Sequence, residues 1–182
     1  MSLKQEASQL LAEKAVIKFD EPVVLASGQT SDIFVDAKAG LATAADLKVV
    51  CAALVEELAE SGIVFDAIGG PTMGADHLAV GMALCADSSW FFVRKEPKGR
   101  GTGKQIEGAP VGPGVRVVVV EDVVSTGGSL MAAIDVVEKT GAAVVAVSTP
   151  IDRGTSAATE LQKRELPYFP LATYEDLGLA PV

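Results

Sequence analysis

Two adjacent carboxylates and a turn rich in hydroxyls and glycines stand close together in the chain. Residues 117–130 read VVVVEDVVSTGGSL, so Glu121 and Asp122 directly follow a run of valines. The turn after them consists of Ser125, Thr126, Gly127, Gly128 and Ser129. Glycines let the backbone direct its N–H groups at one point, hydroxyls add donors, and a following helix presents its positive end there. This combination predicts a site for a phosphate dianion.

The predicted phosphate site differs from the loop that binds nucleoside triphosphates. The GxxxxGK[ST] pattern is absent, and no lysine stands in residues 125–129, so a monophosphate is the expected ligand. Two carboxylates would repel a phosphate unless they have another partner, and the vicinal hydroxyls of a ribose offer two donors. The alternative is a solvated acidic loop before a capped helix. The apolar strand before Glu121 argues against that alternative.

The segments around this turn predict an α/β fold. Five of the six residues at 115–120 are valine, which is typical of a central strand buried on both faces. Further strands are expected at 64–68, 89–93 and 143–147, and helices at 75–85 and 130–139. Such alternation indicates βαβ units and a parallel sheet, with ligands at the carboxyl ends of the strands.

The N-terminal part predicts two helices separated by a hairpin. Apolar residues at helical spacing favour a first helix over residues 3–17. Strands are expected at 23–26 and 32–35, with a turn at 27–30. Thr43, with Asp46 three residues later, is typical of a capping box before the second helix, and Gly62 lies just past that helix. No repeat or linker is visible, so we expect one domain over residues 1–182.

Composition excludes several classes of function. The 182 residues carry a net charge of −9, which disfavours binding to nucleic acid or to an anionic membrane. Aromatic residues are only 5% of the chain, as suits a sheet covered by helices of small residues. Cys51 and Cys85 lie in apolar helical patterns, which predicts buried, reduced thiols. With no signal-peptide core and no apolar run of about 20 residues, we expect a soluble, cytoplasmic protein.

Basic charge is concentrated in one segment. Residues 94–108, RKEPKGRGTGKQIEG, hold five basic residues against two acidic ones, a net charge of +3. The glycines within it favour a mobile lid, whose positive charge would neutralise an anionic leaving group. An exposed loop with scattered charge is the alternative interpretation.

Residues 117–130 resemble the fingerprint of type I phosphoribosyltransferases, in which an apolar strand, two acidic residues and a Ser/Thr/Gly-rich turn lead into a helix. The resemblance implies that Glu121 and Asp122 contact the ribose hydroxyls of phosphoribosyl pyrophosphate, and that residues 125–129 bind its 5-phosphate. It also implies the type I fold, a central parallel sheet flanked by helices. A small hood over the base would come from about residues 1–40 and the C-terminal segment.

The lid resembles the loop of orotate phosphoribosyltransferases, whose pattern is Arg-Lys-Glu-x-Lys-x-His-Gly. The matching residues are Arg94, Lys95, Glu96, Lys98 and Gly101, while Arg100 stands where the family usually has His. In that family the loop reaches across a dimer interface, and its basic residues contact pyrophosphate in the neighbouring subunit's site. The resemblance therefore implies a homodimer, with Lys98 as the main catalytic cation.

Further matches concern the base. Residues 24–38 resemble the family's N-terminal Ser-Gly…Ser-x-x-Phe/Tyr-x-Asp signature, which implies that Ile33 and Phe34 cover the base. Arg153 follows a strand, as the family's orotate-contacting arginine does, and its planar fork suits a planar acid. Ser125 is assigned to the orotate site as well. Taken alone, Arg153 would more often be a surface ion-pair residue.

The chain departs from the family pattern near the pyrophosphate. Ala26 replaces a lysine that contacts the substrate in many relatives. Thr72 and Met73 occupy the pyrophosphate-loop position, where many members have Tyr-Lys, so we still assign them to phosphoribosyl pyrophosphate binding. The missing lysine shifts neutralisation of the pyrophosphate onto the lid.

The resemblance implies transfer of ribose 5-phosphate to orotate, which gives orotidine 5′-monophosphate and pyrophosphate. Mg²⁺ is the expected cofactor, carried mainly by substrate oxygens, without a dedicated cage of carboxylates. Asp76 is open to two interpretations, a metal contact through water or a cap on the helix at 75–85. A purine phosphoribosyltransferase and a non-catalytic sensor of phosphoribosyl pyrophosphate remain as alternative functions.

Overall fold

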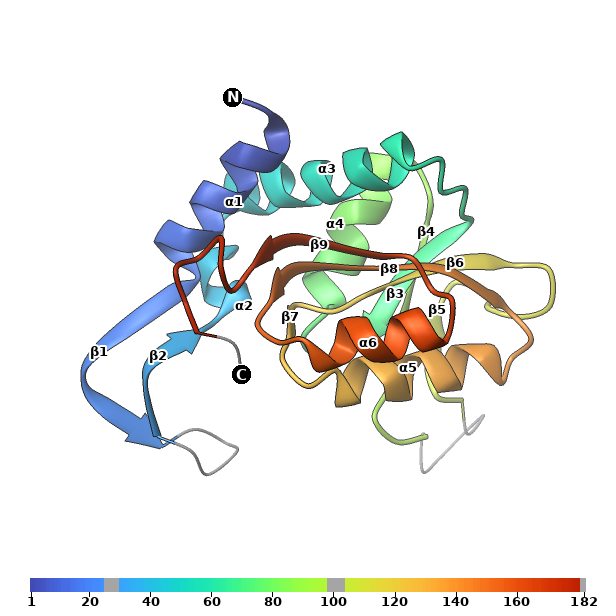
Figure 1. The fold of residues 1–182 in the computed structure, drawn as a ribbon. Coiled ribbons are helices and arrows are strands. Elements are labelled where there is room, and N and C mark those ends of the chain that lie inside the picture. The colour runs from blue at the N-terminus through green and yellow to red at the C-terminus, as the bar shows by residue number, and fades with distance from the viewer. Residues whose placement is uncertain (25–29, 98–103, 181–182) are drawn as a thin grey trace.

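The computed structural model describes residues 1–24, 30–97 and 104–180 (Figure 1). This part of the chain forms a seven-stranded sheet and a separate two-stranded antiparallel sheet. The order along the large sheet is β5-β4-β3-β6-β8, and both β7 and β9 pair with β8. Every pair in it is parallel except β4 with β5. The expected central parallel sheet flanked by helices is confirmed.

The strands of the described chain are β1 (Val16–Val24), β2 (Thr30–Val35), β3 (Ala67–Pro71), β4 (Ser89–Val93), β5 (Ile106–Gly108), β6 (Arg116–Val120), β7 (Val123–Val124), β8 (Ala143–Asp152) and β9 (Tyr168–Thr173). The helices are α1 (Leu3–Lys14), α2 (Ala37–Gly40), α3 (Ala44–Glu60), α4 (Asp76–Ala86), α5 (Gly128–Glu138) and α6 (Ser156–Lys163).

The sheet is buried between two layers of helices. Helices α1, α3 and α4 lie on one face, and α5 and α6 lie on the other (Figure 1). The valines of β6 alternate between the two cores: Val118 and Val120 belong to the first, Val117 and Val119 to the second. All four are fully buried, because alternate residues of a strand point to opposite faces. This confirms the prediction of a central strand buried on both sides.

Several element boundaries differ from the prediction. The first helix ends at Lys14 rather than residue 17, because Val16 and Ile17 pair with Val35 and Phe34 in the β1–β2 sheet. The strand predicted at 64–68 lies at Ala67–Pro71. Elements α2, β5, β7, α6 and β9 were not predicted.

The packing of the N-terminal segment and of the cysteines bears on two further predictions. Helix α1 contributes Ala7 and Leu11 to the first core, while β1 and β2 form a sheet of their own; the predicted hood stays a prediction. Cys51 is buried as predicted, but Cys85 is exposed, so that part of the prediction was wrong. The helical pattern around Cys85 does not reveal that it lies on the side of α4 facing away from the core.

Candidate active site

The predicted phosphate turn connects β6 to α5 at the carboxyl edge of the sheet. Gly127 has a φ of 80°, a left-handed conformation that favours glycine, and α5 begins at the next residue. A Cβ on Gly127 would also lie 2.8 Å from the Cβ of Ala157. Glu121 and residues 123–130 line a cavity of about 220 Å³. The turn thus has the hollow and the helix N-terminus that an anion site needs.

Glu121 is turned inward, toward the start of α5. It is only 4% exposed, and its Oε2 accepts a 2.7 Å hydrogen bond from the Ser129 hydroxyl. Burial raises the pKa of Glu121 to about 7; the Ser129 hydrogen bond opposes this rise and the Asp122 charge adds to it. The Ser129 hydroxyl, predicted as a phosphate donor, is therefore directed at a carboxylate. Only its backbone N–H remains for the phosphate role.

Asp122 points the other way, toward the hood. Its Oδ2 accepts a 2.6 Å hydrogen bond from the Lys38 ammonium, and its Oδ1 accepts one of 2.9 Å from the Val123 N–H. A Cβ on Gly74 would lie 2.7 Å from Oδ1, so the backbone of the pyrophosphate loop passes directly beside this carboxylate. Lys38 was not predicted as a site residue. The available signal was its place at the end of the N-terminal signature, two residues after Asp36.

The predicted pyrophosphate loop, which contains Thr72 and Met73, lies between β3 and α4. The Thr72 hydroxyl donates a 2.8 Å hydrogen bond to Asp76 Oδ2, while the Met73 side chain is 77% exposed. Asp76 does not cap α4, because the N-cap residue is Ala75 and no side-chain cap bond forms, so the capping interpretation was wrong. Asp76 Oδ1 is buried without a partner in the described structure.

A second cavity, of about 460 Å³, joins the pyrophosphate loop to the root of the lid. Its lining residues are Pro71, Thr72, Val93, Arg94, Lys95, Gln105, Gly128, Ser129, Ala132, Ala133 and Val136. It shares Gly128 and Ser129 with the cavity of the phosphate turn. The predicted 5-phosphate and pyrophosphate residues therefore line adjoining hollows.

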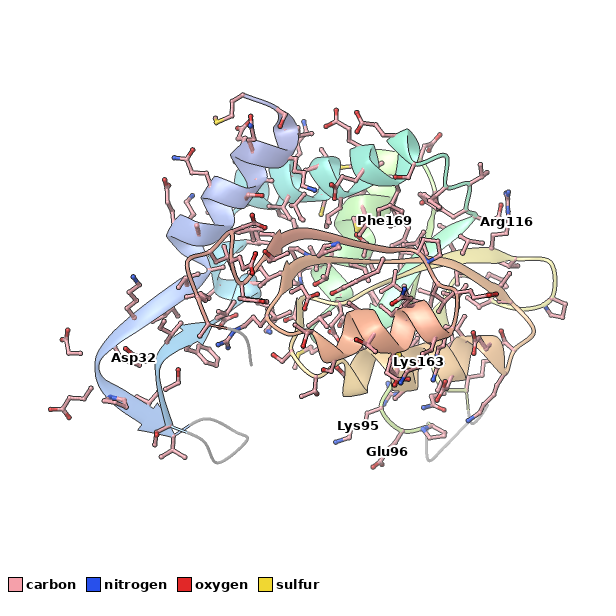
Figure 2. The ribbon with its side chains drawn as sticks, viewed as in Figure 1. Asp32, Lys95, Glu96, Arg116, Lys163 and Phe169 are labelled. Carbon is pink, nitrogen blue, oxygen red and sulfur yellow. The ribbon has the colours of Figure 1, made fainter. Side chains whose placement is uncertain are left out.

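The lid root is held in place at both ends. The Arg94 N–H donates a 2.8 Å hydrogen bond to the Gln105 carbonyl, and the Arg94 guanidinium lies 3.8 Å from Glu107. Ile106–Gly108 pairs with β4, so the predicted lid of residues 94–108 includes a strand at its C-terminal end. Lys95 points away from the sheet at the described end of the loop (Figure 2). Lys98 and Arg100 lie outside the described residues, as does Ala26.

Arg153 approaches the acidic pair from a neighbouring strand end. Its N–H donates a 2.7 Å hydrogen bond to the carbonyl of Val124, which follows the acidic pair by two residues. The Arg153 Nε is buried without a partner, and burial lowers the pKa of this guanidinium. No ion pair joins it to a carboxylate of the described chain. The surface ion-pair interpretation of Arg153 therefore finds no partner among the described residues.

The two predicted apolar contacts to the base, Ile33 and Phe34, are adjacent in β2. Ile33 packs against the first core, whereas Phe34 is 40% exposed. Because neighbouring side chains of a strand point to opposite faces, at most one of them can cover the base in this conformation. The exposed Phe34 is the one free to do so.

Comparison with known proteins agrees with this geometry. Residues 41–168 match the model of the phosphoribosyl transferase domain. The orotate phosphoribosyltransferase of Pyrococcus abyssi is 35% identical to the chain, covering 96% of the chain and 95% of that protein. The chain belongs to the orotate phosphoribosyltransferase family.

Solved members of this family have the same fold. The Mycobacterium tuberculosis orotate phosphoribosyltransferase in complex with 5-phospho-α-D-ribosyl 1-diphosphate superposes with a TM-score of 0.81. It is 30% identical and covers 98% of this chain and 100% of its own. An adenine phosphoribosyltransferase from Leishmania donovani, at 19% identity and a TM-score of 0.71, shares the fold alone. The type I fold expected from the sequence is thus confirmed.

No described helix is long and apolar enough to span a membrane. No group of three or more His, Cys, Asp or Glu side chains in the described chain is arranged to hold a metal ion.

Proposed function

We propose that the protein transfers the ribose 5-phosphate of phosphoribosyl pyrophosphate to orotate, giving orotidine 5′-monophosphate and pyrophosphate. One observation supports this most: a phosphate turn, a buried acidic pair and an arginine without an ionic partner meet at one edge of the sheet. The first suits the 5-phosphate, the second the ribose hydroxyls, and the third the planar acid. Family membership supports the same reaction.

The residues would act mainly by positioning and by electrostatics. The backbone N–H groups of residues 125–129 hold the 5-phosphate, and Asp122 accepts hydrogen bonds from the ribose hydroxyls. Orotate carries its own nucleophilic nitrogen, which attacks the anomeric carbon as the bond to pyrophosphate breaks. Positive charge develops on the ribose and negative charge on the leaving oxygens. Carboxylates on one side and lid cations on the other stabilise these charges.

Mg²⁺ is the proposed cofactor, bound mainly through oxygens of the substrate. The described side chains fit such an ion, because Asp76 Oδ1 is buried without a partner beside the pyrophosphate loop. Asp76 would hold it through water. When bound, the ion would neutralise charge on the pyrophosphate oxygens.

We also propose a homodimer in which the lid of one subunit serves the site of the other. Leu84 on α4 is 80% exposed and Trp90 on β4 is 39% exposed, next to a cavity of about 260 Å³ that both line. Strand β4 leads directly into the lid root at Arg94. An apolar contact here would bring the lid close to the partner. The two free cysteines suit the cytoplasm, where we place the enzyme.

The deciding experiment follows the absorbance of orotate with phosphoribosyl pyrophosphate, with and without Mg²⁺. Adenine, hypoxanthine, xanthine and uracil are assayed in parallel. We expect loss of orotate that requires Mg²⁺ and no reaction of the other bases. Turnover of another base would reject the orotate assignment but retain the phosphate site. Binding of phosphoribosyl pyrophosphate without turnover of any base would favour a sensor.

A further inference from the structure

The pyrophosphate loop of this chain has no cation of its own. Thr72 and Met73 occupy it, the Thr72 hydroxyl is directed at Asp76, and the Met73 side chain projects outward. The nearby Arg94 guanidinium faces Glu107. A pyrophosphate with its metal still needs positive charge close to the anomeric carbon as the bond breaks.

Lys38 places an ammonium beside this loop from the opposite side. Its Nζ lies 2.6 Å from Asp122 Oδ2, and the backbone of Gly74 is packed against the other oxygen of the same carboxylate. The charge of Lys38 also contributes to lowering the pKa of His77, two residues into α4, although burial is the main cause. Lys38, Asp122 and the end of the pyrophosphate loop thus form one cluster.

The backbone that carries Lys38 is fixed against the body of the protein. Ala37 is fully buried, and a Cβ on Gly40 would lie 2.9 Å from the Cα of Ala15. The Asp36 N–H donates a 2.9 Å hydrogen bond to the Ala15 carbonyl, which ties α2 to the end of α1. Lys38 therefore projects from backbone that is packed against the end of α1, although the β1–β2 sheet before it stands apart.

The Lys38 ammonium has N–H donors available for a ligand. It carries three N–H donors, and within the described chain it donates a hydrogen bond only to Asp122, while Asp36 Oδ1 lies 4.0 Å away. The side chain is 52% exposed, so the remaining donors face solvent. Although burial opposes it, the hydrogen bond and charge of Asp122, with Asp36 and Glu121, raise the pKa of Lys38, which keeps it charged.

We propose that Lys38 binds the pyrophosphate of phosphoribosyl pyrophosphate, bridging one of its oxygens to Asp122. It would supply the cation that Thr72 and Met73 do not. This inference rests on the proposed function, because that function identifies the ligand. It adds a residue of the N-terminal segment to the pyrophosphate site, which would otherwise depend on the lid alone.

The test measures calorimetric binding of inorganic pyrophosphate and of ribose 5-phosphate, each with Mg²⁺, to Lys38→Ala. We expect pyrophosphate affinity to fall at least about ten-fold, as for loss of a charged hydrogen bond, and KM for phosphoribosyl pyrophosphate to rise in parallel. Ribose 5-phosphate affinity and the KM for orotate should stay within about two-fold, because neither ligand contains the pyrophosphate group. Lys38→Arg should recover part of the loss, since it keeps the charge.

Lys14→Ala is the matched control. Lys14 is 48% exposed and pairs with Asp46, 12% exposed, at 2.7 Å, but it lies outside the proposed site. Lys38→Gln, which keeps a donor for Asp122 without the charge, serves if Lys38→Ala does not fold. Unchanged pyrophosphate affinity, or equal losses for both ligands, would overturn the proposal in favour of a structural ion pair. If Lys38→Ala selectively loses pyrophosphate affinity but the wild type does not use orotate, the role of Lys38 in pyrophosphate binding stands and the orotate assignment is rejected.

Discussion

The two sides of the candidate site are built in different ways. The ribose-phosphate side comes from one continuous segment, residues 121–129, held between a buried strand and a helix. The proposed base side is assembled from Phe34 in the N-terminal sheet and Arg153, which directly follows β8. The first side is therefore determined by local sequence, whereas the second exists only after distant segments have packed together.

The two sides also differ in how their charges are balanced. Glu121 is buried but has Ser129 as a hydrogen-bond partner, and Asp122 has Lys38. Arg153 has a buried Nε without a partner in the described chain. A half-buried guanidinium whose Nε has no partner is unfavourable, and a bound organic acid would supply that partner. We infer that ligand binding changes the base side more than the ribose-phosphate side.

Lys98→Ala should give the largest effect and tests whether the lid contributes as much to the reaction as the phosphate turn does. We expect kcat to fall roughly 10²- to 10³-fold, because developing charge on pyrophosphate loses its main cation. Thermal unfolding should not change. Steady-state kinetics at saturating substrates measure the effect, with the exposed Lys48→Ala as control. Unchanged turnover would remove Lys98 from catalysis.

A mixture of Lys98→Ala and Asp122→Asn subunits sharpens this result. If the lid serves the neighbouring site, mixed dimers contain one site with both an intact lid and an intact acidic pair, and activity returns. Continued inactivity, with mixed dimers shown to form, would mean that each lid serves its own subunit.

Gly127→Ala tests the local side of the comparison. The substitution places a Cβ at a φ of 80° and 2.8 Å from Ala157, so the turn must shift. We expect the KM for phosphoribosyl pyrophosphate to rise about 100-fold, because the N–H groups no longer converge on the phosphate. Gly62→Ala is the matched control, since Gly62 has a φ of 71° and nothing lies within 4 Å of its Cβ position. Equal kinetics in the two variants would reject the phosphate turn.

The comparison also explains what could be predicted from the sequence. The phosphate turn and Val117–Val120 were predictable because burial and turn chemistry act over neighbouring residues. The helix cap at Thr43 was predictable for the same reason, and the Thr43 hydroxyl accepts a hydrogen bond from the Asp46 N–H. By contrast, Gly69 and Gly70 resemble a turn in sequence but lie within β3, where a Cβ on Gly70 would overlap the Val120 carbonyl oxygen. That requirement comes from a strand fifty residues away and leaves no local pattern.

Within the site, the hydrogen-bond partners of the side chains were harder to predict than which residues lie there. Ser129 stands in the predicted turn, but its hydroxyl donates to Glu121 because the start of α5 faces the end of β6. Lys38 is 84 residues from Asp122, and only the packing of α2 on α1 brings the two together. Strand β9 was not predicted because it contains Pro170, a residue that disfavours strands but is tolerated at a sheet edge.

Arg153→Ala tests the base side. We expect the KM for orotate to rise about 10- to 100-fold, as for loss of a charge-assisted pair, with little change in the KM for phosphoribosyl pyrophosphate. Arg116→Ala is the control: Arg116 bonds Asp66 at 2.8 Å and lies on the far side of the molecule from the β1–β2 sheet (Figure 2). Equal rises in both KM values would make Arg153 a structural residue and not a base contact.

Glu121→Gln tests how much the buried charge of Glu121 destabilises the ribose-phosphate side, through the pH dependence of the free energy of unfolding. Burial raises the pKa of Glu121 from 4.5 to about 7, so between these values the folded protein keeps a proton that the unfolded chain has released. The free energy of unfolding must therefore fall as pH rises through this window, by about 1–3 kcal/mol, and the full cost remains above pH 7.

Glutamine carries no charge, so Glu121→Gln should lose this fall and be more stable than the wild type at pH 8. The difference should shrink toward pH 5.5, where most of the wild-type Glu121 is protonated in the fold. Urea unfolding at both pH values measures it. Parallel profiles for Glu121→Gln and the wild type would show that Glu121 ionises at its ordinary pKa despite its burial.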